Sequence, residues 1–393
     1  MLNKPKRGRQ VSYTMLSRIR ILLHNTILLV NITFVILLLL SYLSARTSPQ
    51  NLWLLSFFGL AYPFLLAVNT GFVVYWAVKR KILFLYSFIA IIIGYSHLTN
   101  TFQISFSRKQ PDRPDNTFTF LSYNVRLFNH YNWIDNHYVK DSIYEFLLSE
   151  DPDIICIQEY FYNEDDAFNN SRSFKRLHER NSHIAFSSSN NRGFNFGIAT
   201  FSRYPIVNKE EIEFINSSNI SIYTDLAINE DTVRVFNSHL QSVQFSSENI
   251  NFLDNLVKYD NRDNIAGIRD IVSRLKQAFV RRSRQVDIIA GHIQESPYPV
   301  IVTGDFNDTP VSYTYRKLRK QKLDDAFVSS GKGIGNTYVA KLPFFRIDFI
   351  LHSRELESFY FATPRIELSD HYPLRCEFSF KRTADYRGQH SPP

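Results

Sequence analysis

Three long apolar stretches dominate the first hundred residues of the chain. They run over residues 21–43, 52–78 and 82–98. No polar face recurs within them at helical spacing, as it would in a surface helix of a soluble domain. Because a helix needs about 20 residues to cross the hydrocarbon core of a bilayer, the pattern predicts three transmembrane helices that form an N-terminal membrane anchor at 1–100.

After residue 116 the pattern changes to short apolar runs rich in β-branched and aromatic residues. Such runs predict strands, and they are FTFLSYNV, DIICIQE, GIATFSRYPI, SIYTDLAI, TVRVFNSHL, PVIVTGDFND, RIDFILHS and PLRCEFSF. Apolar positions at helical spacing occur between them, at 139–151, 271–296 and 312–319. The mixture predicts an α/β domain at 117–381, built as a layered sandwich. A polar, Pro-containing linker is expected at 101–116, and a disordered tail at 382–393.

Charge is divided unevenly between the two parts. Residues 1–100 carry ten Lys and Arg and no Asp or Glu, whereas the remainder carries 35 basic and 37 acidic side chains. The sequence pI of about 9.2 therefore does not indicate a domain that binds nucleic acid phosphates. Basic residues before the first span and at 79–81 predict a cytoplasmic N-terminus. Three crossings then place the α/β domain outside the cytoplasm, periplasmic or extracellular.

Polar residues with catalytic potential cluster where the predicted strands end. Strand ends that share one edge of a sheet converge in space, so separate segments can build a single site. The candidates are Asn124, Glu159, His239, Asp305, Asn307, Asp348, Asp370 and His371.

The runs that carry these residues resemble, in this order, the signature of the endonuclease/exonuclease/phosphatase superfamily. They are SYNVR, IICIQE, GIATFSRYPI, NSHLQS, VTGDFNDTP, RIDFIL and SDHYPL. The resemblance covers about residues 117–381 and implies a two-sheet α/β sandwich that hydrolyses phosphate esters with a divalent metal. Arg126 stands where the apurinic-site nucleases of the superfamily carry an acidic residue. IQEY and NSHLQS look closer to its deoxyribonuclease and sphingomyelinase branches.

The resemblance also implies a role for each candidate residue. Glu159 is the first metal ligand, with Asn124 and Asp370 completing the coordination of Mg²⁺ or Mn²⁺. His371 is expected to be the general base, and Asp348 to fix its tautomer; Asp305 is the alternative base. Asp305 and Asn307 would otherwise hold water and phosphate oxygens, while His239 would steady the leaving group.

Other polar residues are weaker candidates. Asp225 could approach the site from a neighbouring strand, and Arg281, Arg282 and Arg284 favour a solvated helix face. Cys156 and Cys376 are expected to be buried free thiols, although a disulfide between them stays open. Structural or exposed positions are expected for His130, His137, His183, His292 and His352.

The leading functional hypothesis is a membrane-integral phosphoesterase that acts on a phosphodiester or phosphomonoester, with a lipid headgroup favoured. A membrane-tethered nuclease and a catalytically inactive binding module are the alternatives. The first hypothesis predicts that every metal and base residue is present, and the sequence contains all of them.

Overall fold

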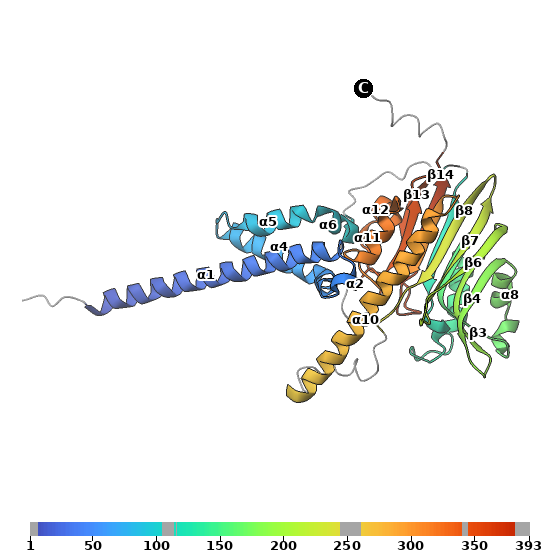
Figure 1. Cartoon of the computed structure of the whole chain (residues 1–393), viewed down its shortest axis with the longest axis horizontal. Helices are drawn as coiled ribbons and strands as arrows, with labels where there is room; N and C mark the ends of the chain where they lie inside the picture. The colour runs from blue at the N-terminus through green and yellow to red at the C-terminus, as the bar shows by residue number, and fades with distance from the viewer. Residues whose placement is uncertain (1–6, 104–113, 115, 244–260, 340–344, 382–393) are drawn as a thin grey trace, which may run out of the picture.

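The computed structural model describes residues 7–103, 114, 116–243, 261–339 and 345–381. The linker expected at 101–116 falls largely outside these ranges, and the tail expected at 382–393 lies wholly outside them. Within the described residues, a sandwich of two six-stranded sheets follows a group of N-terminal helices that extends from one side of it (Figure 1).

The first sheet has the strand order β10-β12-β9-β8-β7-β6. Its strands β8 and β9 are parallel, and the other neighbours are antiparallel. The strands are β6 (Ile206–Glu213), β7 (Ile220–Ile228), β8 (Asp231–His239), β9 (Val300–Asp305), β10 (Leu323–Asp325) and β12 (Asp348–Ser353).

The second sheet has the order β13-β14-β2-β3-β5-β4, again with a single parallel pair, β2 and β3. Its strands are β2 (Phe118–Asn124), β3 (Ile154–Asn163), β4 (Asn181–Ser189), β5 (Phe194–Ser202), β13 (Leu356–Ala362) and β14 (Leu374–Phe380). A separate two-stranded ribbon pairs β1 (Phe102–Gln103) with β11 (Gly333–Ile334).

Apolar side chains from the two inner faces form the central core, where Phe120 and Ile154 of one sheet meet Val235 and Ile301 of the other. Helices α7 (Val139–Ser149) and α8 (Arg172–His178) cover the outer face of the second sheet. Helices α10 (Asn261–Gln294) and α11 (Tyr313–Arg319) cover the outer face of the first. The predicted two-sheet α/β sandwich is confirmed. The described part of the α/β domain also contains the short helices η1 (Arg126–Asn129), η2 (Ala167–Asn170) and α12 (Ala326–Ser330).

Both cysteines lie in the core as expected. Cys156 on β3 and Cys376 on β14 are fully buried and free. Burial raises the pKa of the Cys156 thiol to about 12, so it is an inert core residue rather than a reactive thiolate.

The prediction of three membrane-spanning helices is wrong. Among the described residues, one helix is long and apolar enough to cross a membrane, the segment Ser17–Ser44 of α1 (Arg7–Ser44). The stretch at 52–78 is broken into α2 (Pro49–Leu52), α3 (Leu55–Leu60) and α4 (Tyr62–Val78), and the stretch at 82–98 into α5 (Phe84–Ile93) and α6 (Tyr95–Thr101).

Two residues explain two of these breaks, the one between α3 and α4 and the one between α5 and α6. Pro63 in the first turn of α4 has no N–H to continue a helix from α3. Gly94 separates α5 from α6, and a Cβ there would lie 2.1 Å from the Tyr42 ring. With 17 residues, α4 reaches about 26 Å, less than a bilayer core of about 30 Å.

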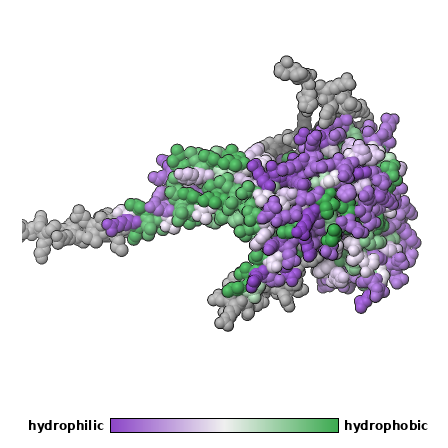
Figure 2. All heavy atoms as spheres, viewed as in Figure 1, coloured by the Kyte–Doolittle hydropathy of each residue, from purple (hydrophilic) through white to green (hydrophobic). Residues whose placement is uncertain are grey.

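Helices α4 and α5 pack against α1 through buried polar side chains. Asn31 on α1 donates to Ser87 (2.6 Å) and accepts from the Trp76 indole (2.9 Å), and Ser87 donates to Asn69 (2.8 Å). Around this network the outer surface is apolar (Figure 2). These buried polar groups satisfy one another, which fixes how the three helices pack.

Candidate active site

The strand ends converge as the sequence predicts, for a simple geometric reason. The parallel pairs β2–β3 and β8–β9 place Asn124 beside Gln158 and His239 beside Asp305. Asn124, His239 and Asp305 stand at the carboxyl ends of β2, β8 and β9, whereas β3 continues past Gln158 to Asn163. Antiparallel β12 begins at Asp348, directly opposite Asp305. The two sheets face each other, so these ends meet at one edge of the sandwich.

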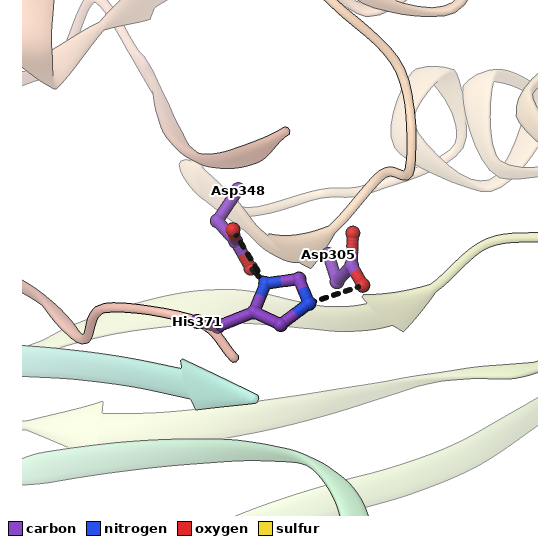
Figure 3. A group of neighbouring side chains, drawn as sticks. All are labelled: Asp305, Asp348 and His371. Carbon is purple, nitrogen blue, oxygen red and sulfur yellow. Dashed lines mark hydrogen bonds and ion pairs between the residues drawn. The ribbon is translucent and has the colours of Figure 1, made fainter. Parts of the chain in front are cut away.

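His371 lies at the centre of the site (Figure 3). Its Nδ1 lies 2.9 Å from Asp348 Oδ2 and 3.1 Å from Oδ1, while its Nε2 faces Asp305 Oδ2 at 3.6 Å. All three residues are buried, with side chains at most 5% exposed. Asp348 therefore accepts the Nδ1–H and leaves Nε2 directed at Asp305.

Asn124 connects the two sheets across the site. Its Nδ2 donates to Glu159 Oε1 (3.2 Å) and Asp305 Oδ2 (3.1 Å), and its Oδ1 accepts the backbone N–H of Arg126 (3.1 Å). The amide oxygen is thus turned away from the carboxylates, and Asn124 acts in this structure as a donor that positions two acids.

The backbone is bent at Glu159 to present its carboxylate. The β3–β5 pairing shifts register between Ile157 and Tyr160, and Glu159 adopts φ 50° within this bulge. A left-handed conformation is uncommon for a residue with a side chain, and bulges often re-aim side chains beside active sites.

Gly304 permits the close approach of β9 to β8 just before Asp305. Its φ is 129°, and a Cβ there would lie 1.9 Å from the Ser238 carbonyl oxygen. Only glycine fits this backbone without strain, so the GD pair places Asp305 against His239.

Three further candidates surround this centre. His239 Nε2 lies 3.7 Å from Asp305 Oδ2 and 3.8 Å from Glu159 Oε1. Asn307 donates its side-chain N–H to Asp305 Oδ2 (3.0 Å). Asp370 Oδ1 is 4.0 Å from His371 Nε2. The structure therefore gathers all eight sequence candidates at one edge of the sandwich.

Arg126 is a member of the site that the sequence did not assign. Its Nε lies 3.2 Å from Asp370 Oδ2, and its guanidinium carbon sits 4.4 Å from the Trp133 ring centre. The left-handed conformation of residues 126–129 turns the chain back toward the site. The sequence signal for this residue was that Arg126 stands where apurinic-site nucleases carry an acidic residue. That difference alone does not show that Arg126 pairs with Asp370.

A second unassigned pair lies behind the site. Arg282 on α10 is buried, with Nε 3.5 Å from Asp308 Oδ2 and Nη1 donating to the Gln241 carbonyl (3.1 Å). The expectation of a solvated face is wrong for Arg282, although it fits the exposed Arg281 and Arg284. Asp308 directly follows the Asp305–Asn307 turn, so this buried pair supports the turn.

Asp225 does not approach the site. It lies opposite Arg234, well inside strands β7 and β8, whereas the site residue His239 pairs at the strand end with Ile220. Arg234 binds both carboxylate oxygens at 2.7 and 2.8 Å. Of the histidines expected to be structural or exposed, His183 and His352 are buried.

The charges at the centre are strongly coupled. Burial lowers the pKa of His371, but Asp348 and Asp305 outweigh it and hold that pKa well above its usual value. Burial raises the pKa of Asp305 to about 6, against the opposing effect of His371. Burial and then Asp370 raise the pKa of Glu159. Burial lowers the pKa of His239.

These residues fit a divalent cation. Four carboxyl groups face one centre, and donor atoms of Asp305, Asp348 and His371 lie within 4.8 Å of one another. Asp348 and His371 are already bound to each other, which leaves Glu159, Asp305 and Asp370 as the more available carboxylates. Among the described residues, the buried His239 Nε2 has no hydrogen-bond partner. Hard oxygen donors with excess negative charge are what Mg²⁺ prefers.

A family model described as the endonuclease/exonuclease/phosphatase family matches residues 121–371, and the chain belongs to this family. Its members are hydrolases that act on phosphate esters. Residues 24–101 match a second model, described as a domain of unknown function (DUF8431). No curated protein matches the chain.

Solved structures of similar fold include the endonuclease/exonuclease/phosphatase of Bacteroides vulgatus, at 18% identity and TM-score 0.49, covering 67% of this chain and 99% of that one. The human Nocturnin catalytic domain with bound sulfate is 18% identical, with TM-score 0.47 and coverage of 68% and 95%. A mannosyl-6-phosphatase of Bacteroides thetaiotaomicron is 16% identical, with TM-score 0.48 and coverage of 67% and 100%.

Proposed function

We propose that the protein is a membrane-anchored hydrolase of phosphate esters that depends on a divalent cation, Mg²⁺ first and Mn²⁺ second. One observation carries the proposal: acids and imidazoles from separate strands meet at one edge of the sandwich, where the pKa values of the buried Asp305 and the half-buried Glu159 are raised. Such a site stabilises positive charge and disfavours an anionic substrate unless a cation accompanies it.

Glu159 and Asp370 would hold the cation, close to Asp305. When bound, a divalent cation neutralises the non-bridging oxygens of a phosphate ester and orients it. Asn124, the third ligand expected from the sequence, would position Glu159 through its N–H, because its oxygen accepts from Arg126. Displaced from Asp370, the Arg126 guanidinium would remain at the rim as a donor to phosphate oxygens.

Proton transfer would involve Asp305 and His371. The raised pKa of His371 favours an imidazolium at neutral pH, whereas Asp305, with a pKa of about 6, is poised as an acceptor. A base works best with a pKa near the working pH. Asp305 would therefore take the proton of the attacking water, which was the alternative assignment from the sequence. His371, held by Asp348, would donate from Nε2 to a phosphate oxygen.

Helix α1 would supply the anchor. Its apolar segment Ser17–Ser44 has the length and composition of a span, and Arg18 and Arg20 lie at its start. One crossing with the N-terminus in the cytoplasm places the sandwich outside it. A tether to the membrane raises the local concentration of a lipid substrate. The near-neutral charge of the C-terminal part provides no basic surface of the kind that binds duplex DNA. A lipid headgroup is thus the favoured substrate class.

The direct test offers the full-length protein in detergent a panel of phosphate esters. The panel contains sphingomyelin, inositol phospholipids, DNA, RNA and a bis-aryl phosphate, each with Mg²⁺, Mn²⁺ or EDTA. Hydrolysis of a lipid with either cation and none in EDTA is expected. Turnover of nucleic acid alone would replace the lipid assignment by the nuclease alternative. If nothing on the panel is hydrolysed, the enzyme proposal fails in favour of a binding module.

A further inference from the structure

Helix α10 is longer than the sheet that it covers. It runs for 34 residues, and only its second half packs on the sandwich, where Val286, Ile289 and Ile293 join the core of the first sheet. The first half leaves the catalytic domain on the side from which the N-terminal helices extend (Figure 1).

The apolar stripe of α10 does not stop where the sheet stops. At about 100° per residue, Ile265, Ile268, Val272 and Leu275 fall on the same face as Phe279 and Val286 farther along. Ile265 is 68% exposed and Ile268 47% exposed, and the projecting end shows as an apolar patch (Figure 2). Because the stripe of α10 stays apolar beyond the sheet that it packs on, its exposed part indicates a second apolar partner.

Contacts at the middle of α10 show where this half lies relative to the anchor. Lys276 Nζ sits 4.9 Å from the Trp53 ring centre, and Phe279 meets Phe57 edge-on at 5.4 Å. Trp53 lies between α2 and α3, beside the exposed Leu52 and Leu54. Amphipathic aromatic rings of this kind gather at the boundary between a bilayer and water. The residues of α10 before Lys276 extend away from this contact.

The charged side chains in the first half of α10 also suit the boundary between a bilayer and water. Arg269 and Lys276 lie along one side of the apolar stripe, and the opposite face carries Ser273 and Gln277, both exposed. Long basic side chains beside an apolar stripe are the pattern of a helix lying in the headgroup region, where they reach anionic lipid.

We propose that the first half of α10, residues 265–276, is a bilayer-contacting surface that sinks its apolar stripe into the same membrane that α1 enters. The inference rests on the proposed anchoring. With α1 it gives the sandwich two separate attachments to the bilayer, so the catalytic domain is held against the membrane surface in one orientation. This deepens the substrate assignment, because a domain held in this way is suited to phosphate esters of membrane lipids.

The test places an environment-sensitive fluorophore on the full-length protein in vesicles of neutral and anionic phospholipid. Labelled variants are Ile265→Cys and Ile268→Cys, with Ser273→Cys as the matched control on the opposite face. Leu29→Cys, at a position 66% exposed on α1, reports on the anchor. The native thiols are buried and stay unlabelled in the folded protein.

Emission from Ile265→Cys and Ile268→Cys should move to shorter wavelength on reconstitution. Nitroxide-labelled lipid should quench it several-fold more than at Ser273→Cys, since an interfacial helix buries its apolar face about 5–10 Å deep. Quenching at Leu29→Cys but not at the two isoleucine positions overturns this inference and leaves the anchor intact. If neither lipid nor aqueous quenchers reach the probes at 265 and 268, then protein covers the apolar stripe. That result also overturns the inference. No quenching at Leu29→Cys would remove the anchor itself.

Discussion

The ionisable side chains of the site differ in how well their neighbours neutralise them. Asp348 has His371 at 2.9 Å, and Asp370 has Arg126 at 3.2 Å. Among the described residues, Glu159 has no basic side chain as close as these: His239 lies at 3.8 Å and burial lowers the pKa of that imidazole, while His371 and Arg126 lower the pKa of Glu159 without an ion pair to it. At the residue scale, therefore, the need for further positive charge is greatest around Glu159.

The His371–Asp348 pair should behave as one unit. We expect His371→Gln and Asp348→Asn each to slow hydrolysis by about two to four orders of magnitude, and the double variant to lose little more than the worse single change. Steady-state rates at saturating Mg²⁺ measure this, with His292→Ala on α10 as a control of near-normal rate. Fully additive losses would mean that the two residues act separately.

His183 should make stability depend on pH. Burial, followed by the charge of Lys209, lowers the pKa of His183 to about 4, whereas an unfolded histidine titrates near about 6.5. The unfolded chain therefore binds more protons between these values, so this contribution is full above pH 6.5 and is lost as the pH falls towards 4.

Thermal unfolding in detergent at several pH values tests the His183 prediction. Between pH 7 and 5, the melting temperature of the wild type should fall further than that of His183→Gln, because the variant lacks the titrating group. Parallel pH curves for the two proteins would show that His183 does not contribute.

At the scale of elements, the sandwich could be predicted because its central strands are apolar and end in polar residues. All eight predicted strands exist, as β2, β3, β5, β7, β8, β9, β12 and β14. The sequence missed the strands at the edges of the two sheets, β4, β6, β10 and β13, and the short ribbon of β1 and β11. Edge strands such as β6, exposed along most of its length, lack the apolar alternation that marks a buried strand.

The sequence predicted which residues form the site but not how their side chains are arranged. Motif order placed the eight residues at predicted strand ends, and topology brought them together, although Glu159 lies at a bulge within β3 and not at its end. The bulge that aims Glu159 and the ion pairs of Arg126 and Arg282 depend on contacts between distant segments, which no local pattern encodes. Pro63 and Gly94 were sequence signals that the predicted membrane-spanning helices are interrupted. The prediction of unbroken spans followed the high mean hydropathy of these stretches instead.

A buried ion pair fastens several elements to the end of the N-terminal region. Arg346 binds Asp325, the N-cap of α12, at 3.1 and 2.6 Å, and donates to the Asn100 carbonyl on α6 (2.9 Å). Arg346→Ala should destabilise the protein by about 3–5 kcal/mol, since it leaves Asp325 buried without its partner.

The control for this change is Arg354→Ala. Arg354 is 61% exposed and 4.0 Å from Asp324, and exposed pairs contribute only about 0–1 kcal/mol. Melting temperatures of the two variants should therefore separate clearly. Equal, small shifts would show that the Arg346 pair does not hold these elements together.

At the scale of the whole molecule, the N-terminal helices dock directly on the catalytic domain. Ser44 Oγ donates to the Val311 carbonyl (3.1 Å), and Gln50 Nε2 to Asp287 Oδ2 (3.2 Å). Val311 lies in the loop that follows Asp305 and Asn307, so the N-terminal helices contact the segment that leaves the site. The site is thereby held in a defined orientation relative to α1.

The proposed topology predicts the side on which the domain lies. A reporter fused after residue 381 should be active outside the cytoplasm, because basic residues precede α1 and one crossing follows. A matched fusion at the N-terminus should be active inside. Cytoplasmic activity of the C-terminal fusion, with none outside, would contradict the orientation.

The most direct measurement is the metal dependence of hydrolysis by full-length wild type and two variants, with a phosphate ester that the wild type accepts. We predict no turnover in excess EDTA and recovery on adding Mg²⁺ or Mn²⁺. Glu159→Gln should require far more metal than the wild type and recover partly at high concentration, whereas His371→Gln should stay slow at every concentration. Undiminished wild-type turnover in EDTA, or a Glu159→Gln metal curve that matches the wild type, would contradict the account.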